Sequence, residues 1–394
     1  MHNSHILKHF TIVLLFCFSA TSLWAQWDKV NWSAQLNGGM EYMLNTFDSW
    51  GEMMNGHTYP MIALRMAHNT DSTSRNRHAA IYGYPAYGFE VSWRGIGRMD
   101  YTGKSHLSDI TTMAAFFERD FVRTQHFSAG YTMQVGLGFN SAVFDSIDNP
   151  QNDVFSAAVL IFIGAGLQAS YRPSEHWEIG LGARVGHFSA GRLSYPNKGL
   201  NEVGANLSLR YRQKPIQAWG PRPHFEPQRR LFGEIYAGGG LHRCKNEWNA
   251  FGRTSPWAIA SMGGSVNYRI LDHISTGLSL DYFNVSRDFL NRLEAADRIL
   301  QGDEKVDKEG RYERNSGGVS FLGQFNYGNF SFITSLGCYV YRHHGLGDDH
   351  GLLYQRAGVK YVMPQLGNLF LAVNVYSHYF SRAYFMEFTT GFRL

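Results

Sequence analysis

A histidine and a serine that could cooperate in ester hydrolysis stand two residues apart in the segment 186–207, GHFSAGRLSYPNKGLNEVGANL. A serine hydroxyl becomes a good nucleophile when a neighbouring imidazole accepts its proton, and a third polar group usually fixes the imidazole tautomer. His187 and Ser189 would share one face of a strand, because residues i and i+2 point the same way. Asn201 and Glu202 follow a polar turn, and each could be the third group. The direction of their side chains, and therefore the surrounding fold, decides between them.

The chain begins with a segment typical of a secretory signal peptide. A start that carries Lys and His precedes an apolar run from Ile12 to about Phe18, and small residues lead to Ala25. This pattern predicts a signal peptide over residues 1–25, with cleavage after Ala25. The run is too short for a membrane span, which needs roughly 20 apolar residues, and no later segment supplies one. We therefore expect an exported protein.

The composition of the remaining chain is typical of an outer-membrane barrel. The sequence contains 28 Phe, 22 Tyr, 9 Trp and 42 Gly, and its net charge of +4 over 394 residues argues against a nucleic-acid partner. Cys244 and Cys338 remain after the predicted processing; they could pair, but two cysteines do not make a disulfide framework. The sequence has no P-loop, dinucleotide fingerprint or paired-cysteine metal motif, so we expect no cofactor and no metal.

Strict alternation identifies the strands. From Phe127 to Phe139 the odd positions are apolar or aromatic, whereas the even positions are small or polar. Strands of barrels that cross a membrane need about 9–11 residues, and this run is long enough. The same pattern predicts strands near 33–44, 57–68, 86–97, 108–122, 125–140, 155–171, 176–188, 198–213, 230–242, 256–270, 273–286, 314–327, 329–342, 352–364, 367–379 and 383–394. The predicted fold class is an all-β, antiparallel outer-membrane β-barrel of about sixteen strands.

Connection lengths leave two architectures open. Connections alternate between short and long, as expected when short turns lie in the periplasm and long loops lie outside the cell. Two of the connections expected to be short periplasmic turns are long instead: 69–85 and the Pro-rich 214–229. The second lies halfway along the chain and could be a long turn in one barrel or the link between two eight-stranded halves. In the second case the halves are residues 26–213, which carry the candidate site, and residues 230–394.

Parity decides which side chains of the candidate site face outward. His187 and Ser189 share the parity of the apolar residues of their strand, and Asn201 shares that of Val203. Glu202 has the opposite parity and should face the lumen. We therefore expect three polar side chains on the outer wall near the extracellular rim, where an acyl chain could approach from the bilayer.

The segment HFSAGRLSYPNKGLN resembles the H-x-S-N-G…PN-x-G-[IL]-N segment of PagL-like lipid A deacylases, which include the Bacteroidetes acyloxyacyl hydrolase family. Four other blocks resemble the longer form of this family: GHTYP at 56–60, YGYPAYGFEVSW at 82–93, GLLYQRAGVKY at 351–361 and HYFSRAYFMEFTTGFRL at 378–394. The resemblance extends over most of the chain after residue 25.

The resemblance implies a carboxylic ester hydrolase that removes an ester-linked acyl chain from lipid A, the anchor of lipopolysaccharide, in the cell outer membrane. His187 matches the family's base and Ser189 its nucleophile. Asn201 stands where the family has an acidic residue that orients the histidine. Ala190 stands where the family has an asparagine that resembles an oxyanion-hole donor, and loss of one such donor costs about a hundredfold to a thousandfold in rate.

The chain ends in Phe392-Arg393-Leu394, which resembles the signal read by the barrel assembly machinery of the outer membrane. A rival hypothesis is a non-catalytic barrel, porin-like or structural. The predicted inner faces of 125–140 and 155–171 are mostly Gly, Ser and Ala, which favours a filled or narrow barrel over a charged channel.

Three other polar groupings have simpler interpretations. The segment HHGLGDDH at 343–350 could hold a divalent cation, but a solvated extracellular loop is the favoured interpretation. The charged run 294–314 is interpreted as a solvated surface loop. His378 has lumen-facing parity, so a structural role is expected for it and for Glu387 across the last connection.

Overall fold

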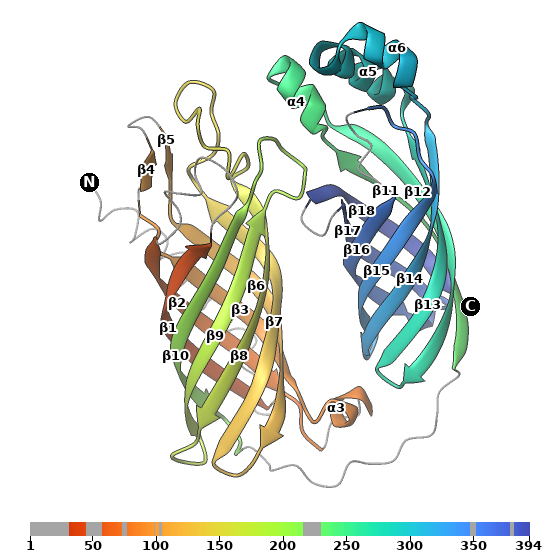
Figure 1. Cartoon of the computed structure of the whole chain (residues 1–394). Coiled ribbons are helices and arrows are strands. Elements are labelled where there is room, and N and C mark those ends of the chain that lie inside the picture. Colours follow the sequence, from red (N-terminus) through yellow and green to blue (C-terminus); the bar gives the residue numbers. More distant parts are fainter. Residues whose placement is uncertain are drawn as a thin grey trace. The chain divides into compact units, whose positions relative to one another are not determined.

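The computed structural model of the chain describes residues 31–44, 57–72, 77–97, 99–101, 105–215, 230–346, 352–378 and 382–394. The predicted signal peptide, residues 1–25, and most of the Pro-rich connection 214–229 lie outside these described residues. The chain forms two compact units, each of which contains one closed antiparallel β-barrel (Figure 1).

Barrel 1 consists of eight strands in the spatial order β1-β10-β9-β8-β7-β6-β3-β2. Their bounds are β1 Trp32–Leu44, β2 Thr58–Asn69, β3 Ala86–Arg94, β6 Ile110–Arg123, β7 Phe127–Asn140, β8 Val159–Tyr171, β9 Trp177–Ser189 and β10 Leu200–Arg212. The connection between β3 and β6 contains a two-stranded sheet, β4 Met99–Tyr101 and β5 Ser105–Leu107, and the connection between β2 and β3 contains helix α3, Arg77–Ile81.

Barrel 2 consists of eight strands in sequence order. Their bounds are β11 Leu231–His242, β12 Trp257–Leu271, β13 Ile274–Val285, β14 Asn315–Tyr327, β15 Phe330–Tyr341, β16 Leu353–Met363, β17 Leu369–His378 and β18 Arg382–Arg393. The connections contain helices α4 Lys245–Phe251, α5 Arg287–Gln301 and α6 Asp303–Glu309, and the short 3-10 helix η2 Pro364–Leu366.

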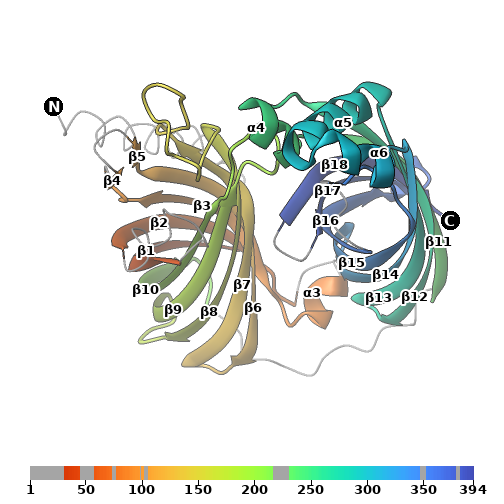
Figure 2. The same ribbon diagram turned by 45° about the horizontal axis from the view of Figure 1, so that its top comes forward.

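The predicted fold class is confirmed, and the sixteen strands are divided between two barrels. β1 pairs with β10 over the whole register from Ser33↔Arg212 to Leu44↔Asn201, and β11 pairs with β18. These two pairings close each ring of eight, so the alternative of two eight-stranded halves is the one that the structure adopts. Figure 2 shows both rings from a second direction.

Alternation produces an apolar outer wall. In β7 the outward side chains of Met133, Val135 and Leu137 are 43–46% exposed, whereas the inward Thr132 and Gln134 are 5–6% exposed. The same contrast recurs in both barrels, and the exposed outer positions are mainly Leu, Ile, Val, Phe and Tyr. A closed sheet that exposes an apolar wall suits a bilayer, since closure pairs every backbone group. No helix among the described residues is both long and apolar enough to span a membrane.

Ion pairs bridge the lumen of barrel 1. Arg210 of β10 binds Glu118 with two hydrogen bonds, of 2.6 and 2.7 Å, from the opposite side of the ring. Arg184 of β9 lies 3.1 Å from Glu41 of β1, and Arg65 of β2 binds Glu90 of β3.

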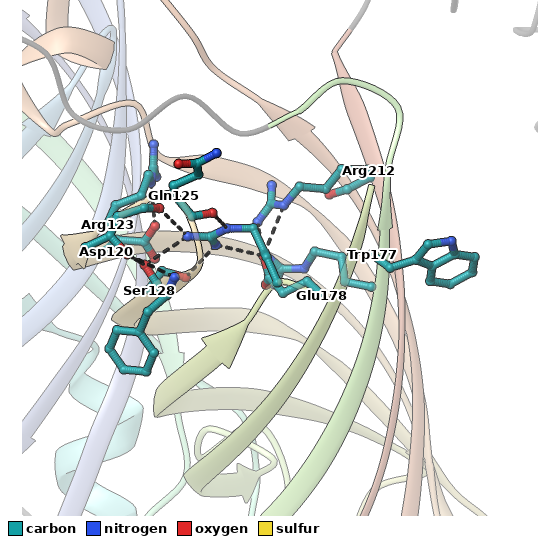
Figure 3. Close-up of polar contacts among 12 residues, drawn as sticks. Asp120, Arg123, Gln125, Ser128, Trp177, Glu178 and Arg212 are labelled. Carbon is teal, nitrogen blue, oxygen red and sulfur yellow. Dashed lines mark hydrogen bonds and ion pairs between the residues drawn. The ribbon is translucent and has the colours of Figure 1, made fainter. Parts of the chain in front are cut away.

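A further polar cluster closes the short-turn end of barrel 1 (Figure 3). Arg172 and Arg212 each lie 3.2 Å from Glu178, and Arg123 lies 2.6 Å from Asp120. Trp177, next to Glu178 in the chain, points away from this cluster. Charge pairs therefore occupy the lumen at several levels, and the pair of Arg210 with Glu118 joins opposite sides of the ring.

The lumen of barrel 2 is filled in a similar way. The Lys360 amine lies 2.6 Å from a carboxylate oxygen of Glu234, and Tyr354 donates a 2.5 Å hydrogen bond to Asp281. Glu387 accepts hydrogen bonds from Ser261 and Asn374. His378 is buried inside the barrel, with its Nε2 3.0 Å from the Tyr339 hydroxyl. The lumen-facing parity predicted for His378 is thus observed.

The prediction of a solvated loop over 294–314 is wrong, because this region is largely helical. Ser286 caps α5 by accepting a hydrogen bond from the backbone of Phe289. Phe289, Leu290 and Leu293 then form one buried face of α5 that packs on the apolar cluster at the long-connection end of barrel 2. Asp297 is buried as well and binds Tyr312 and Asn246, whereas the other charged residues of α5 are at least partly exposed. The high charge content of the segment therefore concealed an amphipathic helix.

The favoured interpretation of 343–350 as a solvated loop is also wrong for His344, which is 1% exposed and lies 3.3 Å from the Tyr384 hydroxyl. Residues 347–350 lie outside the described residues. Among the residues that are described, no group of three or more His, Cys, Asp or Glu side chains is arranged to hold a metal ion. Cys244 is buried and Cys338 exposed, and the two do not form a disulfide.

The filled lumens predict that the protein does not conduct ions. Each lumen holds buried ion pairs and belongs to an eight-stranded ring, which is far narrower than the open bore of a 16-stranded porin. Purified protein incorporated into a planar lipid bilayer should give no conductance steps, with an open porin as the positive control. Stable, discrete channel steps would contradict this reading of the lumens.

Candidate active site

The β9–β10 hairpin of barrel 1 brings His187 and Asn201 side by side. The two residues are direct cross-strand partners, and His187 Nδ1 lies 2.8 Å from Asn201 Oδ1. An amide oxygen can only accept a hydrogen bond, so Nδ1 carries the proton and donates it to Asn201. The other ring nitrogen, Nε2, is then unprotonated and able to accept a proton. This is the tautomer that a general base requires.

Ser189 lies on the same outer face as His187, two residues nearer the end of β9. On the neighbouring strand β8 its cross-strand partner is Ile161, and that of His187 is Ile163. His187, Ser189 and Asn201 are all partly exposed. The structure thus places the three predicted residues together on the outer wall, at the long-connection end of barrel 1.

The residues that alternate with these three are anchored inside the barrel. Phe188 and Leu200 are completely buried and Ala190 is 2% exposed. They belong to the mouth cluster, an apolar group inside the long-connection end of barrel 1: Met43, Tyr59, Ile96, Leu107, Ile110, Ala114, Val154, Phe155, Leu160, Phe162, Phe188, Ala190 and Leu200. Each polar residue of the site therefore stands next to a backbone position that is fixed by packing.

Gly199 borders the proton-accepting edge of His187. A Cβ atom on Gly199 would lie 3.0 Å from His187 Cε1, 3.6 Å from Nε2 and 2.6 Å from the Phe188 carbonyl oxygen. The backbone φ of Gly199 is +75°, a conformation that favours glycine. Any other residue here would strain the turn and crowd the imidazole. Gly199 thus keeps the edge of the ring clear, which spacing alone did not reveal.

Glu202 faces the lumen, as its parity predicts, and does not contact His187 in any described interaction. Its carboxylate is completely buried and binds Arg94 of β3 and Tyr59 of β2. Of the two candidates for the third group, Asn201 is the one beside the imidazole.

Ala190 belongs to the mouth cluster and lies on the inner side of the wall. A side-chain amide at this position would enter apolar surroundings. The family resemblance places an asparagine that could bind the oxyanion at this position, but here Ala190 packs in the mouth cluster.

Sequence reasoning missed Arg94, Tyr59 and Gly199. Arg94 directly follows the block YGYPAYGFEVSW, and Tyr59 lies within GHTYP, so both stand in or beside segments that resemble the family. The signal that could have found Arg94 and Tyr59 is their parity, which places both side chains in the lumen on neighbouring strands. Their common partner depends on the closure of the barrel, which brings β2 and β3 near β10.

The closed barrels, apolar outer walls and filled lumens define an integral β-barrel protein of the outer membrane. The family model for lipid A 3-O-deacylase (PagL) matches residues 62–210, within barrel 1, and the model for the acyloxyacyl hydrolase C-terminal domain matches residues 232–394, nearly all of barrel 2. The chain therefore belongs to the PagL-like family of lipid A deacylases and acyloxyacyl hydrolases. No curated protein sequence matches the chain.

Three of the solved structures similar to this chain match about one barrel of it. Neisserial surface protein A (NspA) is 10% identical, covering 46% of this chain and 96% of its own, with a TM-score of 0.29. The outer membrane enzyme PagL is 14% identical, covering 47% and 99%, with a TM-score of 0.28. The outer membrane protein AlkL is 13% identical, covering 48% and 93%, with a TM-score of 0.25.

The hydrogen bond to Asn201 predicts a single tautomer for His187. In protein with ¹⁵N-labelled histidine, the nitrogen chemical shifts should identify Nδ1 as the protonated atom of the neutral ring. Asn201→Leu removes the acceptor and should give a mixture of tautomers. Ser208→Ala, on the inner face of the same strand, is the matched control and should leave the His187 signals unchanged. A native ring protonated at Nε2 would contradict the geometry.

Proposed function

We propose that barrel 1 is an outer-membrane esterase that removes an ester-linked acyl chain from lipid A, with Ser189 as nucleophile and His187 as general base. The observation that carries the proposal is the 2.8 Å contact from His187 Nδ1 to Asn201 Oδ1 on the outer wall. It leaves Nε2 as the proton acceptor on the face that Ser189 shares. The match of residues 62–210 to the lipid A 3-O-deacylase family supports lipid A as the substrate.

The reaction follows the two-step course of serine hydrolases. The Ser189 hydroxyl gives its proton to His187 Nε2 as its oxygen attacks the ester carbonyl. The ester C–O bond then breaks as the imidazolium protonates the leaving alkoxide oxygen of lipid A, and the acyl chain remains on Ser189. A water molecule, deprotonated by His187, attacks the acyl-enzyme and releases the fatty acid. Asn201 holds the ring in the required tautomer throughout.

The surroundings of the hairpin suit an acyl chain. On the outer wall, Ile163 of β8, Val185 of β9 and Val203 of β10 are exposed and lie next to the site. These side chains face the hydrocarbon of the bilayer, so a lipid A acyl chain could reach Ser189 without leaving the membrane. The site would then lie in the outer leaflet, with the long connections outside the cell.

Two features of the site predict slow turnover. Asn201 is neutral, so it orients the imidazole but does not stabilise the imidazolium as a carboxylate would. Ala190 supplies no side-chain donor for the oxyanion that forms as the serine attacks, and a missing donor costs about a hundredfold to a thousandfold in other hydrolases.

Delivery of the protein to the membrane is part of the proposal. Residues 1–25 would direct export, and the terminal strand would be read by the barrel assembly machinery. In support, β18 ends at Arg393 with Phe392 and Leu394 exposed, at 45% and 62%. A non-catalytic barrel is the second candidate, and its porin-like form is opposed by the ion pairs that cross both lumens.

Replacement of the nucleophile or the base should abolish deacylation. We expect Ser189→Ala to lower the rate by about 10⁴-fold or more, and His187→Ala to do nearly the same, because residues of such a unit act together. The measurement is the acyl content of lipid A, by mass spectrometry, from cells that carry each variant. Heat-modifiable gel migration reports folding, and Ser208→Ala is the matched serine control. Full activity in a folded Ser189→Ala barrel would leave the non-catalytic candidate standing.

A carboxylate at position 201 should raise activity. Asn201→Asp keeps the size of the side chain and replaces a neutral acceptor by a charged one, whose hydrogen bond is worth roughly 1 kcal/mol more. We expect kcat to rise about fivefold to tenfold, since 1.36 kcal/mol corresponds to tenfold. Asn201→Leu, which removes the acceptor, should lower kcat. An unchanged or lower rate in folded Asn201→Asp would mean that Asn201 does not act through the imidazole.

A further inference from the structure

We infer that Arg94, inside barrel 1, is a positioning residue for the site on the outer wall, and that it acts through Glu202 and Phe188. This inference rests on the proposed function, because it concerns the same His187 and Ser189. Arg94 ends β3, and its side chain is completely buried, as is that of Glu202. Neither residue reaches the outer face, so any effect on the site passes through the wall of the barrel.

The first link runs through Glu202 to Asn201. Arg94 binds the Glu202 carboxylate through Nε, at 2.9 and 2.8 Å, and through Nη2, at 2.7 Å. Paired contacts of this kind fix the orientation of both groups. Glu202 directly follows Asn201 in β10, and its cross-strand partner, Gly186, directly precedes His187. Anchoring Glu202 therefore restrains the backbone of the pair that makes the 2.8 Å contact.

The second link runs through Phe188 to His187 and Ser189. The Arg94 guanidinium lies 4.8 Å from the centre of the Phe188 ring and 4.9 Å from that of Phe162, and the two ring centres are 4.7 Å apart. A cation over aromatic faces is attracted to both. Phe188 stands between His187 and Ser189 in the chain, so one guanidinium restrains both strands of the hairpin from inside.

Arg94 and Glu202 are themselves held by other strands. Arg94 Nη1 donates to Ser92 Oγ at 2.9 Å and to Thr112 Oγ1 at 2.8 Å. Tyr59 donates a 2.6 Å hydrogen bond to Glu202 Oε2. The contacts of this pair thus come from β2, β3, β6, β8, β9 and β10, which makes its position largely independent of the loops.

The same lumen offers a matched ion pair without this connection. Arg210 and Glu118 make a similar two-point pair, at 2.6 and 2.7 Å, and both are about 5% exposed. Arg210 lies eight residues beyond Glu202 along β10, about 26 Å at the rise of a strand. No residue next to Arg210 or Glu118 in the chain belongs to the candidate site. Loss of this pair should affect stability but not the geometry of the site.

The test compares neutralised pairs, because removal of one partner alone leaves an uncompensated buried charge that destabilises any barrel. The double variant Arg94→Met/Glu202→Gln is compared with Arg210→Met/Glu118→Gln in the full-length, membrane-extracted protein. Heat-modifiable migration measures folding, and deacylation of lipid A in detergent micelles gives kcat and KM. We expect the first double variant to lose at least about tenfold in kcat relative to the second, with KM similar, since small misplacements of reacting groups are costly.

A second readout does not depend on activity. The ¹⁵N shifts of His187 should show a mixture of tautomers in Arg94→Met/Glu202→Gln and a single Nδ1-protonated form in Arg210→Met/Glu118→Gln. If the parent protein does not deacylate lipid A, the proposed function fails while these shifts still test the positioning. Equal kcat and a single tautomer in both folded double variants would overturn the inference.

Tyr59→Phe keeps the test decisive if the Arg94 double variant does not fold. This change removes only the hydroxyl that binds Glu202 and leaves the charge pair intact. We expect kcat to fall with KM unchanged, and the His187 signals to broaden or split. An unchanged kcat and unchanged His187 signals in Tyr59→Phe would equally overturn the role of the Arg94–Glu202 pair.

Discussion

Closure of the sheet is the constraint on which the rest of this structure depends. In a closed antiparallel ring every backbone group is paired, and every side chain must face either the lumen or the outer wall. An apolar outer wall then leaves few polar residues facing the bilayer, so their presence calls for an explanation. The pair His187 and Asn201, joined at 2.8 Å, is such a case at one rim of barrel 1. The fold therefore turns a common pair of residue types into a site with a defined face, tautomer and neighbour.

The ion pairs in the lumen of barrel 1 do more than compensate one another's buried charge. Breaking one buried ion pair typically costs about 3–5 kcal/mol, whereas replacing a whole pair by neutral groups is often neutral for stability. Neutral side chains of similar volume could therefore fill the lumen equally well. Arg94 differs from its neighbours in the lumen because its partners, Glu202 and Phe188, adjoin all three residues of the site. This connection gives the buried charge a use that hydrophobic packing of equal volume would lack.

The two barrels share an architecture but not a site. In β17 and β18, Val375 pairs with Met386 and Val373 with Phe388, and these positions on the outer wall carry no polar group. His378, the late histidine of β17, is buried and bonded to Tyr339. Aromatic packing under α5 closes the long-connection end of barrel 2. These positions of β17 and β18 thus hold no counterpart of the pair formed by His187 and Asn201.

The sequence by itself determined the strands, the all-β class and the face on which each candidate residue lies, because a period of two is written directly in the alternation of residue types. It also singled out His187, Ser189 and Asn201, and assigned Glu202 to the lumen.

The sequence left the number of barrels open, since alternation is the same in one ring of sixteen and in two rings of eight. Only the pairings of β1 with β10 and of β11 with β18 distinguish these two architectures. It misread α5 as a loop because the charged face of an amphipathic helix dominated the composition. The partners of Glu202 could not be predicted either: Tyr59 and Arg94 lie 143 and 108 residues away, and they meet Glu202 only when the ring closes. Local periodicity is encoded in adjacent residues, whereas contacts across a lumen depend on closure and register, which belong to the tertiary structure.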